Sequence, residues 1–152
     1  MNTEDCINKY LYYKDGFLFW KGLTRRTDLN DKVAGSLSKN GYVQVRINQK
    51  LLYAHRVVFF IHYGYWPKEV DHINRNKTDN RVKNLRACTR SNNTRNSPSK
   101  NFYIDKRNGN YRVRLFFDGK QLSFGSYSEF EFAELVAKEA REKYYGEWAY
   151  DY

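Results

Sequence analysis

Residues 70–88 read VDHINRNKTDNRVKNLRAC, and this stretch decides the fold around which the chain is organised. Its two ends, 70–73 and 85–88, are short apolar runs that predict two strands. The polar residues between them predict a loop, with one helical turn near 79–82. The pattern indicates two strands joined by a loop that is rich in amide and basic side chains.

A helix is expected directly after the second strand, over 90–95, because Thr89 is a suitable N-cap. Strand, loop, strand and helix in this order would bring Asp71 and Asn93 together. Side chains alternate along a strand, so His72 would face away from Asp71 and toward a substrate. Asn92 is the alternative partner of Asp71 if the helix is rotated by one residue.

This grouping contains an imidazole, a carboxylate, neutral amides and basic side chains. Together they offer a general base, two kinds of oxygen ligand for a cation and a means of holding phosphate. These are the parts required to hydrolyse a phosphodiester with one hard metal ion. A lone Asp-His pair or a lone Asn would more often be structural, so the prediction depends on the whole set.

The composition agrees with a polyanionic partner. The chain has 152 residues, with 27 Lys and Arg against 17 Asp and Glu, which gives a net charge of +10. An excess of this size attracts nucleic acid and makes binding depend on salt. No apolar run is long enough for a membrane span, and the acidic N-terminus lacks a signal-peptide core. Cys6 and Cys88 stand alone, which argues against a zinc knuckle or a disulfide scaffold and fits the cytosol.

The charge is unevenly divided along the chain. Residues 1–102 carry 19 basic and 8 acidic side chains, whereas residues 103–152 carry 8 basic and 9 acidic ones. The polar segment 96–101, which contains Pro98, joins two differently patterned regions and predicts a linker. We therefore expect one domain over 1–98 and a second over 99–152.

The N-terminal region is expected to be rich in β-structure. Residues 17–20 follow an Asp-Gly turn, residues 41–47 alternate apolar with polar, and 51–54 would be the returning strand. Residues 55–63 predict a buried helix that Gly64 ends. His55 and His62 are expected to be structural histidines there, whereas Arg56 could reach a phosphate.

The central segment resembles the HNH nuclease family, whose fold is a ββα-metal unit. The closest likeness is to phage-type homing endonucleases, in which the motif reads His-Asn-Asn. The pattern is carried by Asp71-His72, Asn84 and Asn93, with His55-Arg56 and Trp66-Pro67 upstream. The resemblance covers roughly residues 40–97, and several positions at set spacing make it specific.

The resemblance implies a role for each motif residue. His72 would deprotonate the attacking water, and Asn84 would hydrogen-bond near it and fix the orientation of its ring. Asp71 and Asn93 would bind one Mg²⁺ or Mn²⁺, with water and phosphate oxygens completing the shell. The substrate would be double-stranded DNA. Candidate DNA contacts in this half of the chain are Arg56, Arg75, Arg86, Arg90 and Arg95.

The last fifty residues predict a different unit. Residues 102–106 and 111–117 read as strands, Asp118-Gly119 is a hairpin turn, and 122–124 return. A helix capped by Ser128 would follow, end at Gly146 and pack on the sheet. Basic residues outnumber acidic ones by five to two over 103–124, whereas acidic residues outnumber basic ones by seven to three over 125–152. A basic sheet backed by an acidic helix is typical of a protein that reads DNA with its sheet.

This region resembles the AP2 DNA-binding domain, a three-stranded sheet packed on one helix. The matching sequence is GNYRVR at 109–114, GK at 119–120, FGSY at 124–127 and YGEWA at 145–149. Tyr111 stands where that family usually has Trp. In that family the sheet enters the major groove, so the resemblance implies DNA contacts from Lys106, Arg107, Arg112, Arg114 and Gln121.

We therefore expect an α+β protein of two domains: a β-rich N-terminal region with a ββα-metal motif, then a three-stranded antiparallel sheet with one helix. The expected function is phage-type homing endonuclease, acting in the cytosol of a bacterial host with one metal ion per active site. A monomer would naturally nick one strand, whereas a homodimer could cut both. The alternatives are an AP2-type binding protein that does not cut and a nonspecific nuclease.

Overall fold

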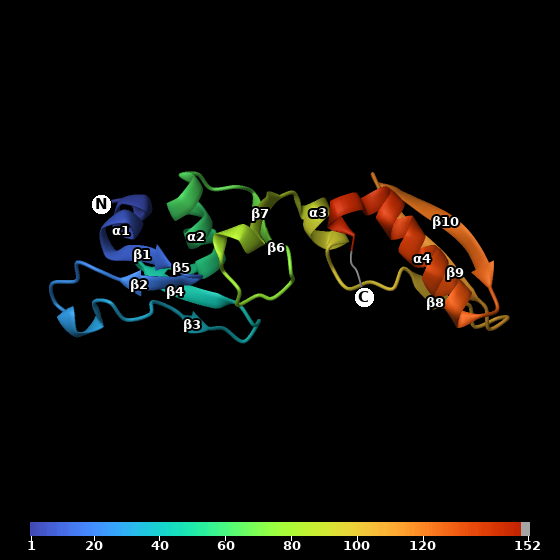
Figure 1. Cartoon of the computed structure of the whole chain (residues 1–152), viewed down its shortest axis with the longest axis horizontal. Coiled ribbons are helices and arrows are strands. Elements are labelled where there is room, and N and C mark those ends of the chain that lie inside the picture. Colours follow the sequence, from blue (N-terminus) through green and yellow to red (C-terminus); the bar gives the residue numbers. More distant parts are fainter. Residues whose placement is uncertain (150–152) are drawn as a thin grey trace. The chain divides into compact units, whose positions relative to one another are not determined.

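The structure is a computed structural model that describes residues 1–149 (Figure 1). It divides into two compact units, Met1–Thr89 and a second that begins at Arg90. The division falls before the boundary expected at 98/99, so the helix at 90–95 groups with the second unit. Its last residue, Arg95, accounts for this, because it forms an ion pair with Asp118 and stacks on Phe117 in that unit.

The first unit combines small antiparallel sheets with helices. Its elements are α1 (Thr3–Tyr10), β1 (Leu11–Lys14), β2 (Phe17–Trp20), η1 (Thr27–Leu29), β3 (Ser36–Leu37), β4 (Val43–Ile47), β5 (Lys50–Tyr53), α2 (Ala54–Tyr63), β6 (Glu69–His72), η2 (Val82–Asn84) and β7 (Leu85–Cys88). The sheets are β1-β2, β3-β4-β5 and β6-β7. The predicted strands at 17–20, 85–88 and within 41–47 are confirmed.

Two hairpins follow from their turn residues. Asp15 and Gly16 both have positive φ between β1 and β2, and so do Asn48 and Gln49 between β4 and β5. Two consecutive positive φ angles make the turn type whose twist matches that of paired strands. The second turn therefore lies one residue earlier than expected, and β5 begins at Lys50.

Helix α1 was not expected from the sequence. Asn2 caps it, since the Asn2 side chain accepts from the amide of Asp5 and the Asp5 carboxylate accepts from the amide of Asn2. The helix buries Cys6 and Ile7 in the core. Only these two positions and the cap distinguish it, which is a weak pattern over eight residues.

Helix α2 supplies the centre of the first core. Val57 and Val58 are fully buried and pack with Val45 of β4 and Ile7 of α1. The helix ends at Gly64, whose φ of 77° is the left-handed conformation that glycine adopts without strain. The predicted buried helix with a glycine stop is confirmed.

Over residues 90–149, the second unit has a three-stranded antiparallel sheet, two α-helices and one 3₁₀ helix. Its elements are α3 (Arg90–Arg95), β8 (Phe102–Ile104), β9 (Tyr111–Phe117), β10 (Lys120–Tyr127), α4 (Phe130–Tyr145) and η3 (Gly146–Trp148), with strand order β10-β9-β8. Helix α4 packs on one face of the sheet, where Ala133 and Ala137 contact Val113 in a small core. The N-cap of α4 is Glu129 without a side-chain hydrogen bond, so the cap expected at Ser128 is wrong.

Candidate active site

The β6–β7 hairpin positions the first two motif residues. His72 pairs with Leu85 and Asp71 pairs with Arg86, and the amide of Ile73 donates to the carbonyl of Asn84 at 2.9 Å. Asp71 is 6% exposed and His72 is 4% exposed. The hairpin therefore holds a carboxylate and an imidazole in the interior of the first unit, on neighbouring positions of one strand.

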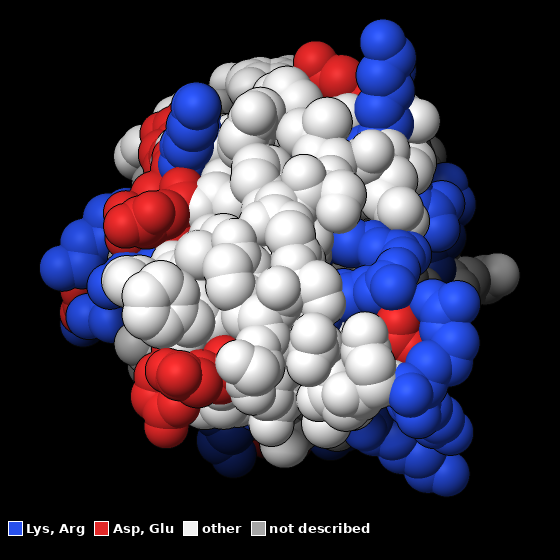
Figure 2. All heavy atoms as spheres, turned by 90° about the vertical axis from the view of Figure 1, so that its right-hand side faces the viewer, with Lys and Arg blue, Asp and Glu red and all other residues white. Residues whose placement is uncertain are grey.

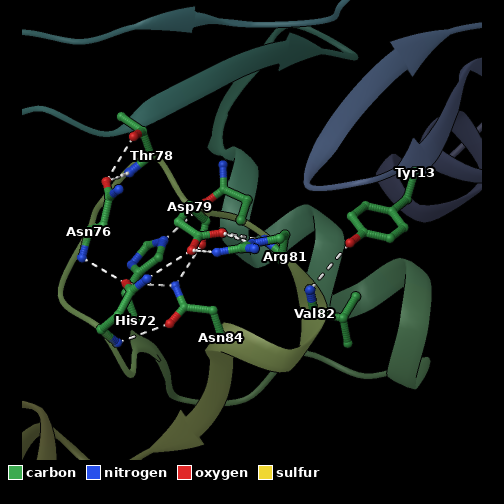
Figure 3. Close-up of polar contacts among 10 residues, drawn as sticks. Tyr13, His72, Asn76, Thr78, Asp79, Arg81, Val82 and Asn84 are labelled. Atoms are coloured by element: carbon green, nitrogen blue, oxygen red, sulfur yellow. Dashed lines mark hydrogen bonds and ion pairs between the residues drawn. The ribbon is translucent and has the colours of Figure 1, made fainter.

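The His72 ring contacts an amide of the loop and aromatic side chains, and Figure 3 draws it among the polar side chains of the loop. Its Nε2 lies 2.9 Å from Oδ1 of Asn80, and its ring centroid lies 4.8 Å from that of His55. Tyr42 is a further neighbour, at 6.1 Å between centroids. Asn80 is itself 3% exposed. When Nε2 carries the proton and donates it to Asn80, the basic lone pair of the neutral ring is on Nδ1.

Burial keeps both inner histidines neutral. It lowers the pKa of His72, and the hydrogen bond with Asn80 and the charge of Asp71 offset this only in part. Burial also lowers the pKa of His55 to about 3, with smaller contributions from His72 and Arg56. A neutral imidazole is the form that can accept a proton, so the electrostatics suit His72 for base chemistry.

Asn84 makes contacts that differ from the expected ones. Its Nδ2 donates to Oδ1 of Asn74 at 2.9 Å and to the carbonyl of Asp79 at 2.8 Å, and its Oδ1 accepts from the amide of Asn74 (Figure 3). The expectation that Asn84 holds the His72 ring is corrected, since Asn80 makes that bond. Asn84 lies at the end of η2, from which its amide reaches the loop backbone.

The loop between β6 and β7 is built on its own polar side chains. Arg81 donates to Asp79 through Nε at 2.7 Å and through Nη2 at 2.6 Å, and Asn74 donates to the same carboxylate at 2.8 Å. The bond from Arg81 is the largest cause that lowers the pKa of Asp79. These contacts hold the loop that carries Asn80 in place. In the sequence, the same side chains are indistinguishable from charged residues that simply face solvent.

Asp71 forms an ion pair across the hairpin. Nε and Nη2 of Arg86 each lie 3.0 Å from Oδ2 of Asp71, and the two side chains are 17% and 8% exposed. Arg86 was expected to contact DNA, and here its guanidinium faces a carboxylate of its own chain. Any cation that binds Asp71 would therefore compete with Arg86 or share the carboxylate with it.

The two predicted metal ligands lie in different units. Asp71 belongs to β6 of the first unit, and Asn93 and its alternative Asn92 belong to α3 of the second. A carboxylate and an amide are hard oxygen donors, so their chemistry fits Mg²⁺ or Mn²⁺. Residues 1–149 contain no cluster of three or more His, Cys, Asp or Glu that could hold a metal ion. A cation held by Asp71 would need water or phosphate oxygens among its other ligands.

The other arginines that were expected to bind DNA have varied surroundings. Arg56 donates to the carbonyls of Pro67 and Lys68 at 2.9 and 3.0 Å, so its guanidinium braces the chain between α2 and β6. Arg95 contacts Asp118 and Phe117 in the second unit. Arg90 is exposed at the start of α3, and Arg75 is partly buried in the loop.

The second unit presents arginines on the sheet face away from α4. Asp105 pairs with Arg107 at 3.0 Å and with Arg112 at 2.7 Å, and the hydrogen bond from Arg107 is the main cause that lowers the pKa of Asp105 to about 2. The guanidinium of Arg114 lies over the ring of Tyr103, 4.6 Å from its centroid. Lys106 and Gln121 are exposed.

Charge is segregated on this unit. The exposed charges of α4 are mainly acidic: Glu131, Glu134, Glu139 and Glu142. Figure 2, in which the end drawn at the right of Figure 1 faces the viewer, shows acidic side chains mainly on the left, where basic ones also stand, and basic side chains mainly on the right, with a broad uncharged band between them. The expected basic sheet and acidic helix are therefore both present.

The sequence predicted a helical turn near 79–82, which includes Asn80, and did not indicate the contact of Asn80 with His72. The contact depends on how the loop folds back onto β6, which the spacing of residues in the sequence does not predict. His55 was correctly expected to be buried, but its place beside His72 was not foreseen.

Among residues 1–149, no helix is long and apolar enough to cross a lipid bilayer.

Comparison with known proteins supports the nuclease resemblance and leaves the second one unsupported. No curated protein and no solved structure matches the chain. The family model that matches does not reach the C-terminal sheet and helix, so the AP2 likeness rests on the three strands, the helix and the sequence pattern alone. The family model of the HNH endonucleases matches residues 52–95, a span that contains β6, the loop, β7 and α3. The chain therefore carries an HNH endonuclease domain at residues 52–95.

Proposed function

We propose that this protein is a metal-dependent DNA endonuclease of the phage homing type, with His72 as general base. The observation that carries the proposal is the buried, neutral His72 imidazole, held by Asn80 and adjacent to Asp71, inside the segment that matches the HNH endonucleases. Phosphodiester hydrolysis needs a proton acceptor next to an anionic ligand, and this strand provides both.

In the proposed reaction, His72 takes a proton from a water molecule as the water oxygen attacks phosphorus. The bond from phosphorus to the 3′-oxygen breaks, and this oxygen takes a proton from solvent, which leaves a 5′-phosphate and a 3′-hydroxyl. Asn80 keeps the ring in one orientation throughout. Because His72 is 4% exposed, water has to reach it with the scissile phosphate, on DNA binding.

Asp71 is the proposed ligand of one Mg²⁺ or Mn²⁺ in the first unit, and Asn93 of the second unit is a candidate ligand on the grounds of the sequence motif alone. The ion would stabilise negative charge at phosphorus and at the leaving oxygen. Asn84 supports the site indirectly, since its bonds to Asn74 and Asp79 fix the loop that carries Asn80. Site selection is assigned to the C-terminal sheet, because Arg112 and Arg114 lie on β9 and Lys106 and Arg107 lie in the turn before it.

Nicking of supercoiled plasmid tests this function. We expect full-length protein to convert the plasmid to open circles in Mg²⁺ or Mn²⁺, to stop in EDTA, and to leave 5′-phosphate ends. Asp71→Asn should lower the rate at limiting Mg²⁺ more than at saturating Mg²⁺. If DNA is bound but never cut with either ion, the protein is a binding protein and the endonuclease proposal fails.

A further inference from the structure

The C-terminal sheet has an open face that carries an apolar side chain in an otherwise polar surface. On β9, Val113 and Leu115 point to α4 and are buried, so the alternate residues Arg112, Arg114 and Phe116 point away from it. Phe116 is 65% exposed. A single exposed ring is common at protein surfaces, so its meaning depends on the side chains beside it.

Phe116 has a defined neighbour across the hairpin. It pairs with Gln121 of β10, and Arg114 pairs with Ser123. Residues that are directly paired in an antiparallel ladder have Cβ atoms about 4.5–5.5 Å apart on the same face, so the ring and the amide lie side by side. Phe116, Gln121 and Arg114 also line one hollow, together with Ser99, Asn101 and Tyr103.

Arg114 is the cation of this face that has no carboxylate partner within residues 1–149. Arg107 and Arg112 both pair with Asp105, whereas the guanidinium of Arg114 stacks on Tyr103 at 4.6 Å. Stacking fixes the plane of the guanidinium and leaves its N–H donors for a ligand. Oδ1 of Asn101, in the same hollow, is buried without a hydrogen-bond partner.

We propose that Phe116 and Gln121 together read one A·T base pair in the major groove, next to a guanine read by Arg114. A glutamine amide matches the N6 and N7 edge of adenine, an apolar ring contacts the thymine methyl group, and arginine matches O6 and N7 of guanine. Residues 114 and 116 are about 6.6 Å apart along the strand, so the two base pairs are neighbours or next neighbours. The inference rests on the proposed function, since it assumes that this sheet binds the target.

The test uses full-length protein in EDTA, so that DNA is bound and not cut. Sites are selected from a random duplex library with wild type, Phe116→Ala and Gln121→Ala. Phe132→Ala is the matched control, because Phe132 is 56% exposed on α4. We expect both sheet variants to lose preference at the same A·T pair, with Gln121→Ala costing roughly 5- to 150-fold in discrimination there, while the control keeps the wild-type preference.

A second measurement changes the DNA and uses wild-type protein, so its main result does not depend on whether a variant folds. Deoxyuridine replaces thymine at the selected pair, which removes one methyl group and should weaken wild-type binding about four-fold. Phe116→Ala should not distinguish the two bases. Unchanged preference in both sheet variants, or no effect of the methyl group on wild type, overturns the proposal. If Arg114→Ala still broadens site choice, sheet-based selection survives; if no variant alters it, the role assigned to the sheet fails as well.

Discussion

Oδ1 of Asn80 lies 2.9 Å from Nε2 of His72, and both side chains are almost fully buried. This bond fixes the orientation of the imidazole from the loop side, a task that the sequence motif led us to expect of Asn84. It makes Asn80 a positioning residue for the proposed base.

Asn80→Ala should therefore lower the nicking rate by about 10- to 100-fold with little change in DNA affinity. Removing the amide frees the ring to rotate and leaves Nε2 without its partner. Asn40→Ala is the matched control, because Asn40 is an exposed asparagine of the same unit. Rates measured under single turnover, with affinity from titration, give the comparison. Equal rates for the two variants would contradict the positioning role.

The ion pair between Asp71 and Arg86 should be worth more than a surface pair. Arg86→Ala leaves a carboxylate buried without its cation, so it should lower the free energy of unfolding by about 1–3 kcal/mol. Arg26→Ala breaks an exposed pair with Asp28, which solvent screens, and should leave the free energy of unfolding close to that of wild type. Denaturant melts of the two variants provide the measurement.

The same variant reports on the metal ligand without any cleavage assay. Once Arg86 is gone, a divalent cation no longer competes with it for Asp71. Mg²⁺ should then raise the Tm of Arg86→Ala more than that of wild type, and the additional replacement Asp71→Asn should remove the difference. An equal Mg²⁺ response in all three proteins would speak against Asp71 as a ligand.

The buried His55 should make the fold sensitive to acid. Its pKa is about 3 in the folded chain and roughly 6.5 when unfolded, so between these values the unfolded chain binds more protons. Stability should rise with pH across this window, with a slope from this group of up to about 1.4 kcal/mol per pH unit, and level off above it. His72 contributes in the same direction, since burial lowers its pKa too.

Comparison of wild type with His55→Gln separates the contribution of His55 to the pH dependence of the free energy of unfolding. Unfolding free energies of wild type and His55→Gln, measured from pH 4 to 8, should converge at low pH and separate toward neutrality. His62→Gln, at an exposed histidine of the same helix, should track wild type. Parallel profiles for wild type and His55→Gln would show that the imidazole is not held neutral.

Replacement by alanine should lower the thermal stability more at Gly35 than at Gly64. Both have positive φ, at 104° and 77°, so alanine is strained by about 1 kcal/mol at either position. A Cβ on Gly35 would also lie 2.7 Å from the carbonyl oxygen of Gln44, whereas a Cβ on Gly64 meets nothing within 4 Å. Thermal melts should therefore place Gly35→Ala below Gly64→Ala, and the reverse order would contradict the close packing of β4.

The elements that could be predicted were those with strong local signals. Gly64 marks the end of α2, the Asp-Gly turns mark two hairpins, and the apolar ends of residues 70–88 mark β6 and β7. Helix α1 was not predicted, because it has few apolar positions. The cap expected at Ser128 failed because α4 begins after Glu129 without any side-chain cap.

The candidate site was predictable in its residue types and not in its contacts. The motif brought out His72 and Asp71, but the partners Asn80 and Arg86 depend on how the loop folds back and on strand register. A run of basic residues reads as a DNA surface in sequence. In the fold, Arg56, Arg81 and Arg86 bond to carbonyls and carboxylates of their own unit, contacts that the sequence did not indicate.

The most direct test of the account compares His72→Ala with His62→Ala on supercoiled plasmid in Mg²⁺, with DNA affinity measured alongside in EDTA. Loss of a general base should slow nicking by at least about 100-fold, while affinity stays within a few-fold of wild type and His62→Ala behaves as wild type. Nicking by His72→Ala at the wild-type rate would contradict the assignment of His72 as the base.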